Sequence, residues 1–146
     1  MSQRDIHSLY TPTPMLGPIT ATTDQTGSAI ALGTAHQAFA VNILVGVGGI
    51  SFDDSNKIDF KLQKSSDGST FEAVTQADVR GVTVGSGGIV KSLVAAHAAA
   101  SATRIGIVKG DITHLKAIAD YTGTHGTATP WAVELIKANP LIGPAV

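Results

Sequence analysis

The residues that could do chemistry in this chain are few, and their spacing assembles no recognisable reactive site. Five histidines are present, and imidazole can act as a metal ligand or a proton shuttle. His36, His97, His114 and His125 have no second ligand type two or four residues away, as a metal site on a single strand or helix requires. His114 and His125 flank a predicted strand, and we interpret both as surface side chains. The sequence therefore predicts no bound metal.

Carboxylates give an equally weak signal. Asp53, Asp54 and Asn56 could offer oxygen ligands to Ca²⁺, but the glycine and the final glutamate of a calcium-binding loop are missing. The only glutamates are Glu72 and Glu134, and each falls on a predicted strand face. Hydrolysis by a pair of carboxylates is therefore poorly supported.

Two glycine-rich stretches could belong to loops that bind phosphate or present a nucleophile. The stretch 46–49 is not followed by Gly-Lys-Ser or Gly-Lys-Thr, and the stretch 85–87 lacks the spacing of a nucleophile elbow. Both are interpreted as turns. Taken together, the candidate groups predict a protein that is not an enzyme and that carries no cofactor.

Composition narrows the classes of partner. The 146 residues fit one domain, contain no cysteine, and carry a net charge of −1 with 14% charged residues. Lysine and arginine are scattered, so we expect no nucleic-acid partner. No apolar run approaches the ~20 residues of a spanning helix, and the first residues do not resemble a signal peptide, so we expect no membrane partner. The low charge favours a surface partly covered by other protein, although a monomer can share this composition.

The stretch from residue 56 to residue 74 organises the predicted fold. Polar and apolar residues alternate along its first half, which is typical of a strand with one solvated face and one buried face. The alternating residues are Lys57, Ile58, Asp59, Phe60, Lys61, Leu62 and Gln63. Residues 65–69 make a turn and residues 70–74 a returning strand. Since a hairpin with one apolar face needs another sheet to cover it, the sequence predicts an all-β fold, an antiparallel sandwich or barrel.

Further strands follow from the same alternation. They are predicted at residues 19–23, 28–32, 37–47, 104–108 and 111–122 and from residue 130 onward, with a turn at 24–27. In the stretch 37–47, one face carries Phe39, Val41, Ile43, Val45 and Val47. Trp131, in the last predicted strand, is predicted to lie in the core. Small and mixed residues share the other face of 37–47, from Ala38 through Leu44 to Gly46, which predicts a central strand at least partly covered on both sides.

Two stretches are less regular. In residues 76–88, Val79, Val82 and Val84 could form a short strand, but the several glycines there favour a mobile surface loop, which we predict. Residues 89–102 fit either a helix or a strand followed by a loop. We favour the strand and loop, because the flanking elements are all predicted strands.

The two ends are predicted to make contacts outside the domain. We divide the chain into an extended N-terminal arm at 1–18, a β-sandwich domain at 19–138 and a C-terminal tail at 139–146. Prolines disfavour both a helix interior and a central strand in the arm. Its apolar groups must be buried either on their own domain or on a neighbouring subunit, and both alternatives stay open. The predicted interaction residues are Ile6, Leu9, Tyr10, Pro12, Pro14, Met15, Leu16, Leu141 and Ile142.

Several motifs together resemble a known class of proteins. Residues 62–71 carry a Leu-Gln-x-Ser-x-Asp-Gly-x-x-Phe hairpin, and residues 78–81 read Asp-Val-Arg-Gly. A Gly-Thr-His-Gly-Thr turn at 123–127 and an Asn-Pro…Pro-Ala-Val ending at 139–146 complete the pattern. Over roughly residues 19–146 the chain resembles small capsid-associated, decoration- or cement-like structural proteins of tailed bacteriophages. It departs from them at residues 107–114, which lack the tyrosines usual there.

The resemblance implies a β-sandwich of jelly-roll type that decorates or cements a capsid by bridging subunits of the major capsid protein. It implies a virion protein on the capsid surface, assembled in the host cytoplasm, with no active site. We also expect a homo-oligomer, with a trimer as one form. A structural protein of the head–tail connector or of the tail is the nearest alternative. A β-sandwich module that binds glycans or a host receptor is a second alternative.

Overall fold

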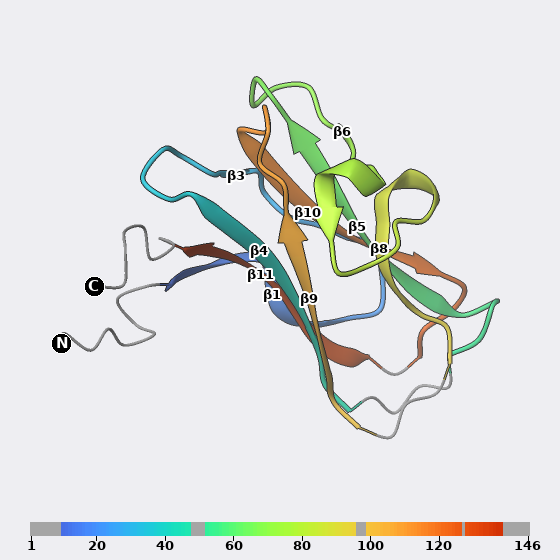
Figure 1. Ribbon diagram of the computed structural model, residues 1–146. Helices are drawn as coiled ribbons and strands as arrows, with labels where there is room; N and C mark the ends of the chain where they lie inside the picture. Colours follow the sequence, from blue (N-terminus) through green and yellow to red (C-terminus); the bar gives the residue numbers. More distant parts are fainter. Residues whose placement is uncertain (1–9, 48–51, 96–98, 127, 139–146) are drawn as a thin grey trace, which may run out of the picture.

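Strand alternation in the sequence produces two antiparallel β-sheets in a computed structural model that describes residues 10–47, 52–95, 99–126 and 128–138 (Figure 1). Sheet A has the strand order β1-β11-β4-β9-β7, and sheet B is built on β10 and β5 with short strands on both sides. The strands of sheet A are β1 (Tyr10–Ala21), β4 (Ala38–Val45), β7 (Val79–Arg80), β9 (Ser101–Ile107) and β11 (Thr129–Ala138). Those of sheet B are β2 (Gln25–Thr26), β3 (Ile30–Ala31), β5 (Lys57–Ser65), β6 (Glu72–Ala73), β8 (Ile89–Leu93) and β10 (His114–Thr122).

The two sheets face each other across one hydrophobic core. Buried residues alternate along β4, β10 and most of β11, as the pattern predicted. The Phe60 ring of sheet B meets the Trp131 ring of sheet A edge-on at 5.3 Å. Trp131 is 2% exposed, so its predicted place in the core is confirmed. The chain is therefore an all-β antiparallel sandwich. Its jelly-roll connectivity stays a prediction.

No α-helix occurs in the described ranges, and none of their helical turns has the length and apolar character that crossing a bilayer requires. The helical turns are the 3-10 turns η1 (Gln76–Asp78) and η2 (Ser86–Gly88). Residues 89–102 follow the strand alternative, because β8 ends at Leu93 and β9 begins at Ser101. The stretch between them includes residues 96–98, which lie outside the described part of the chain.

The predicted hairpin after β5 is present, and its turn is held by one aspartate. The Asp67 carboxylate accepts hydrogen bonds from the backbone N–H groups of Ser69 and Thr70, each at 2.8 Å. Gly68 takes a φ of 77°, which a glycine adopts without strain. Hydrogen bonds from the Thr70 and Ser69 N–H groups and from the Ser65 hydroxyl lower the pKa of Asp67 to about 2.

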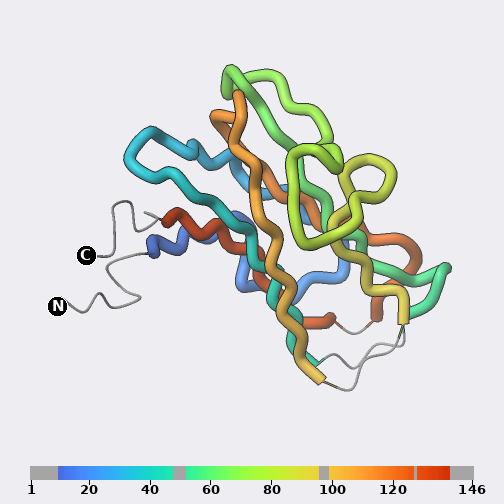
Figure 2. Tube along the Cα trace, viewed as in Figure 1, coloured from blue at the N-terminus to red at the C-terminus, as the bar shows by residue number. Residues whose placement is uncertain are grey.

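The first strand corrects the predicted boundary of the N-terminal arm. We predicted an arm through residue 18, but β1 begins at Tyr10 and pairs with β11 at the edge of sheet A, from Tyr10 opposite Ala138 to Ala21 opposite Thr129. Figure 2 shows these two strands side by side, although they come from opposite ends of the sequence. The alternative in which this segment lies on its own domain therefore holds for residues 10–18. Residues 1–9 and the tail 139–146 lie outside the described residues.

Prolines are compatible with β1 because it is an edge strand. Pro12 and Pro14 occupy alternate positions, so each can turn its missing N–H side away from β11 without breaking the ladder. The register shifts between Leu16 and Ile19, where Gly17 takes a φ of 80°. A second register shift, between Pro14 and Leu16, lies at Met15, whose side chain is buried in the core and 4% exposed.

Two loop predictions are corrected in part. Gln25 and Thr26 were assigned to a turn, but they form β2 and pair with Ala119 and Ile118 of β10. The predicted mobile loop at 76–88 is wrong, because the stretch contains η1, β7 (Val79–Arg80) and η2. Val79 is fully buried, and the side chains at 82 and 84 pack against the core.

An ion pair joins the two sheets at one end of the sandwich. The Lys64 ammonium of β5 lies 2.9 Å from the Asp78 carboxylate of η1, just before β7, and the two side chains are 18% and 14% exposed. The hydrogen bond to Asp78 raises the pKa of Lys64. Burial opposes ionisation of Asp78, but hydrogen bonds from Thr75 and Lys64 together hold its pKa below the ordinary 3.8.

Candidate interaction surface

The outward side of sheet A is nearly free of charge and is the candidate interaction surface. Its central strands place their buried residues toward the core, so the alternate residues point outward. We call these outward positions of β4, β9 and β11 the sheet A face. It comprises Ala38, Ala40, Asn42, Leu44, Ala102, Arg104, Gly106, Ala132, Glu134, Ile136 and Ala138.

Strand register arranges this face in rows that run across β9, β4 and β11. Gly106, Ala40 and Ile136 form one row; Ala102, Leu44 and Ala132 form another. Most members are small, so the face is flat, and Leu44 stands out from it with 40% of its surface exposed. A flat apolar sheet face of this kind is suited to contact with another protein surface.

One polar row crosses the middle of the face. The Arg104 Nε donates to the Asn42 Oδ1 at 3.1 Å, and the Asn42 Nδ2 donates to a Glu134 carboxylate oxygen at 3.1 Å. The amide therefore links a cation on β9 to an anion on β11. Arg80 of β7 lies at the rim, opposite Gly106, and its guanidinium donates a hydrogen bond to the backbone carbonyl oxygen of the preceding residue, Val79.

A shallow groove of about 480 Å³ lies at one end of this face. Leu44, Ala102 and Ala132 line it from the face itself, and Pro18 and Pro130 close its border. The lining is almost wholly apolar, so the groove can take an aliphatic side chain but offers little to hold a polar small molecule.

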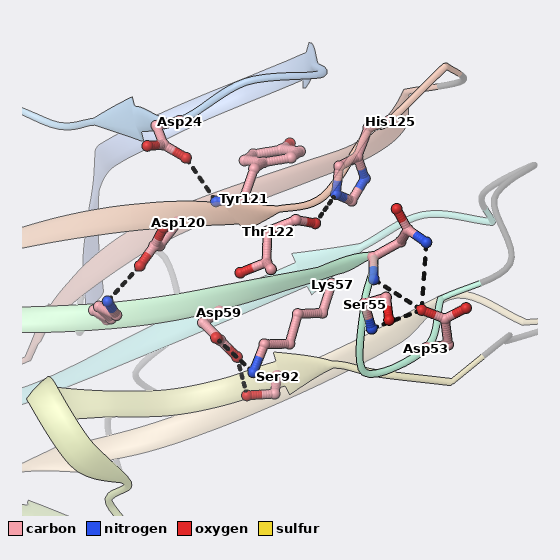
Figure 3. A network of polar contacts seen from close by, with 12 residues as sticks. Asp24, Asp53, Ser55, Lys57, Asp59, Ser92, Asp120, Tyr121, Thr122 and His125 are labelled. Atoms are coloured by element: carbon pink, nitrogen blue, oxygen red, sulfur yellow. Dashed lines mark hydrogen bonds and ion pairs between the residues drawn. The ribbon is translucent and has the colours of Figure 1, made fainter.

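The outward side of sheet B is charged and satisfies its charges internally (Figure 3). Asp59 is only 6% exposed, accepts a hydrogen bond from the Ser92 hydroxyl and lies 3.5 Å from the Lys57 ammonium. Lys61 pairs with Asp120 of the neighbouring strand. Lys61 and Asp59 of the predicted solvated face of β5 thus have partners on neighbouring strands, Asp120 and Ser92, as is typical of a face in water.

The acidic loop residues have structural roles. Asp53 accepts hydrogen bonds from the backbone N–H groups of Ser55 and Asn56 at 2.8 Å each, and these two bonds lower its pKa. Asp24 accepts one from the Tyr121 N–H at 2.7 Å. Within the described ranges, no group of three or more histidines or carboxylates could hold a metal ion.

The prediction that His125 lies at the surface is wrong, because it is 5% exposed. Its Nε2 lies 2.8 Å from the Thr122 carbonyl oxygen, which fits an N–H donor there. The rings of Tyr121 and Phe52 pack around it at 4.9 Å and 6.2 Å. Phe52 belongs to a loop far from His125 in the sequence, so this burial cannot be seen in the pattern of a single strand.

The predicted interaction residues divide into three groups. Tyr10, Pro12 and Pro14 are exposed on β1, next to the sheet A face. Met15 is buried and Leu16 packs against the core, so neither is available to a partner as predicted. The remaining ones, which are Ile6, Leu9, Leu141 and Ile142, lie outside the described residues.

Sequence reasoning missed the residues of the polar row and the role of Leu44. The signal was present in the second face of residues 37–47, which was predicted to be partly covered. In the structure Ala38, Ala40 and Asn42 are half-buried by their neighbours, while Leu44 is exposed. The chain therefore covers only part of the second face of residues 37–47.

Comparison with protein-family models, with curated proteins and with solved structures gives no match.

Proposed function

We propose that the protein is a structural component of a phage capsid, which decorates or cements the shell by bridging subunits of the major capsid protein. The observation that carries this proposal is the flat, mostly apolar sheet A face. It is continuous with Tyr10, Pro12 and Pro14 on β1. A contact surface of small apolar residues with a polar row at its centre matches protein interfaces, which are depleted in charge at their core.

The ends of the chain support the same role. Tyr10 is opposite Ala138 at one end of sheet A, so the segments 1–9 and 139–146 both attach there. They contain Ile6, Leu9, Leu141 and Ile142. Because Tyr10 and Ala138 lie side by side, two segments with apolar residues begin at the same end of sheet A and could contact neighbouring subunits. Repeated attachment over a symmetric shell would raise retention through avidity.

Jelly-roll connectivity is part of this proposal. From β4 onward the long strands alternate between the layers, since β4, β9 and β11 belong to sheet A, and β5 and β10 to sheet B. Both sheets are antiparallel throughout, as two Greek-key motifs require.

Co-sedimentation with purified capsids of the phage or prophage that encodes the chain tests the function. Deletion of residues 1–9 and 139–146 should keep the fold and weaken capsid binding. Deletion of residues 1–17 is a poorer test, because it removes most of β1. Equal binding by the variant without 1–9 and 139–146 argues against a role of the ends.

Copy number separates the shell from other positions in the particle. A copy number comparable to that of the major capsid protein supports the shell. A single ring of copies supports the head–tail connector instead. Failure to sediment with capsids at all contradicts the proposal.

A further inference from the structure

The sheet A face carries its positive charge on one side of the central strand β4 and its negative charge on the other side. Among its residues, Arg104 on β9 is the cation and Glu134 on β11 is the anion, at the same height on either side of Asn42. Arginine has five N–H donors, and in the described part of the chain only Nε of Arg104 has a partner. Charge on this face is therefore antisymmetric about the central strand β4.

Side-chain size follows the same division. Ile136 on β11 and Gly106 on β9 stand at one height, on either side of Ala40. Ala138 ends β11 in register with Ala38, while exposed Val108 follows β9. In these two rows, a large side chain on one side of β4 therefore lies level with a small one on the other side.

We propose that this face binds a second copy of the chain, related by a twofold axis that runs along β4. Rotation about this axis makes the second sheet face the first and keeps each residue at the same position along β4. It places β11 of each copy against β9 of the other. Packed sheets cross at about 30°, so the axis bisects the two β4 directions.

This arrangement pairs the antisymmetric features. Glu134 of each copy faces Arg104 of the other, so the pair contains two equivalent contacts. In each, the NH₂ groups of Arg104 donate charge-assisted hydrogen bonds to the Glu134 carboxylate. Ile136 of each copy faces the space above Gly106 of the other. A twofold axis perpendicular to β4 in the same plane would instead set Arg104 against Arg104, which like-charge repulsion disfavours.

The central strand meets itself along the axis. Asn42 faces Asn42 of the second copy, and two amides can exchange donor and acceptor. The Leu44 side chains meet beside the apolar groove, whose alanines at 102 and 132 leave room for them. The second copy supplies the cover that the alternate face of residues 37–47 lacks in one chain.

The available area predicts a reversible dimer. β4 has eight residues, and with about 3.4 Å per residue and about 4.8 Å between strands, the three strands of the face span roughly 400 Å² per copy. The pair would bury about 800 Å², below the area of stable specific interfaces and in the range of weak ones. We therefore expect association that responds to dilution. The proposal does not depend on the capsid role, because the pair forms in solution.

Sedimentation velocity of the purified full chain, over a range of concentrations, tests the pair. The mass should rise from one chain of 14.9 kDa to two chains as concentration increases. Arg104→Glu sets two carboxylates against each other, and a cost of several kcal/mol corresponds to about 100-fold weaker association. Glu134→Arg should have the same effect.

An equimolar mixture of the two charge variants gives the sharpest result. One copy then carries two glutamates and the other two arginines, so both contacts are complementary again and a heterodimer should form. Gly106→Val provides a test without charge. The added side chain meets Arg80 Cβ at an ordinary 3.4 Å within the chain, but it fills the space that Ile136 of the second copy needs.

Lys116→Glu is the matched control, because it makes the same change of charge on the outward side of sheet B and should leave association unchanged. Circular dichroism establishes that each variant is folded. A wild type that stays monomeric overturns the proposal, as does a trimer. A dimer that persists in Arg104→Glu and Gly106→Val, or variants that fail to associate when mixed, overturns it as well. The proposed capsid contact uses the same face, so the weak pair must separate before that contact forms. Capsid binding is measured separately by co-sedimentation, and a wild-type chain that forms the dimer but does not sediment with capsids contradicts the capsid role alone.

Discussion

The two outward sides of the sandwich follow the same strand alternation and yet carry different side chains. On sheet B, lysines and aspartates alternate and pair across neighbouring strands, as with Lys61 and Asp120. On sheet A, alanines, glycine, Leu44 and Ile136 dominate, with one linked polar row. The period of two fixes which residues point outward, while the side chains decide whether that side faces water or protein.

The two layers nevertheless share one core, so they should unfold together. Phe60→Ala removes a 1% exposed ring that contacts Trp131 across the layers. We expect the free energy of unfolding to fall by about 3–5 kcal/mol. Urea denaturation followed by tryptophan fluorescence and by far-UV circular dichroism should give one coincident transition, whereas two separate transitions would mean that the sheets are independent. Val47→Ala, at a 60% exposed position, should change stability by less than about 0.5 kcal/mol.

The Lys64–Asp78 pair ties the end of β5 to the turn before β7, and its loss should have the next largest effect. Lys64→Met leaves a largely covered carboxylate without its cation, which should cost about 2 kcal/mol at neutral pH. Chemical denaturation measures the loss. Lys109→Met, for which no ion pair occurs in the described residues, should stay within about 0.5 kcal/mol.

The pair also predicts how stability changes with pH. The pKa of Asp78 is lowered from 3.8, so its contribution is present above that value and is lost as pH falls through the folded-state pKa. The pKa of Lys64 is raised from 10.5, so its contribution is complete below that value and is lost as pH rises through the folded-state pKa. Equal pH profiles for the wild type and Lys64→Met would contradict this coupling.

A matched pair of amide substitutions compares the two faces directly. Asp59→Asn removes a nearly buried charge that binds Ser92 and Lys57 on sheet B, and should cost about 1 kcal/mol. Glu134→Gln on sheet A retains a carbonyl oxygen for Asn42 and should cost less than about 0.5 kcal/mol. Urea denaturation in low and high salt should show a loss for Asp59→Asn that shrinks with salt. A larger loss from Glu134→Gln than from Asp59→Asn would reverse the contrast that we draw.

The smallest expected effect concerns the turn at Asp67, which is outside both faces. Asp67→Asn removes the charge that accepts two backbone N–H bonds and should lower the melting temperature at neutral pH. Because the pKa of Asp67 is lowered from 3.8 to about 2, its stabilisation is present above 3.8 and is lost as pH falls through about 2. Melting temperatures between pH 2 and pH 5 should therefore vary less in the variant. Ser66→Ala, at an exposed neighbour, should keep the wild-type profile, and an unchanged Asp67→Asn profile would contradict this role.

The sequence predicts the long strands well because their buried residues alternate without interruption. The buried positions of β4 and β5, from Val41 to Leu62, follow directly from that period. It fails at β1, where prolines argue against a strand unless the strand is known to lie at an edge. Edge position depends on the distant partner β11, and no local pattern contains that information.

The candidate surface was less predictable for the same reason. Asn42, Arg104 and Glu134 are far apart in the sequence, and only strand register brings them into one row. The ends were predicted to make the contacts because their apolar residues are visible in the sequence. Met15 shows the limit of that reasoning, since an apolar residue near the chain's beginning can equally be part of the core.

The prolines of β1 have a consequence for crowding. Pro12 and Pro14 leave the free border of sheet A without donors at two successive outward-directed positions. A neighbouring strand cannot be added there with a full ladder, so many copies held close together cannot grow laterally into fibrils from this border. The two prolines therefore keep contacts along this border finite.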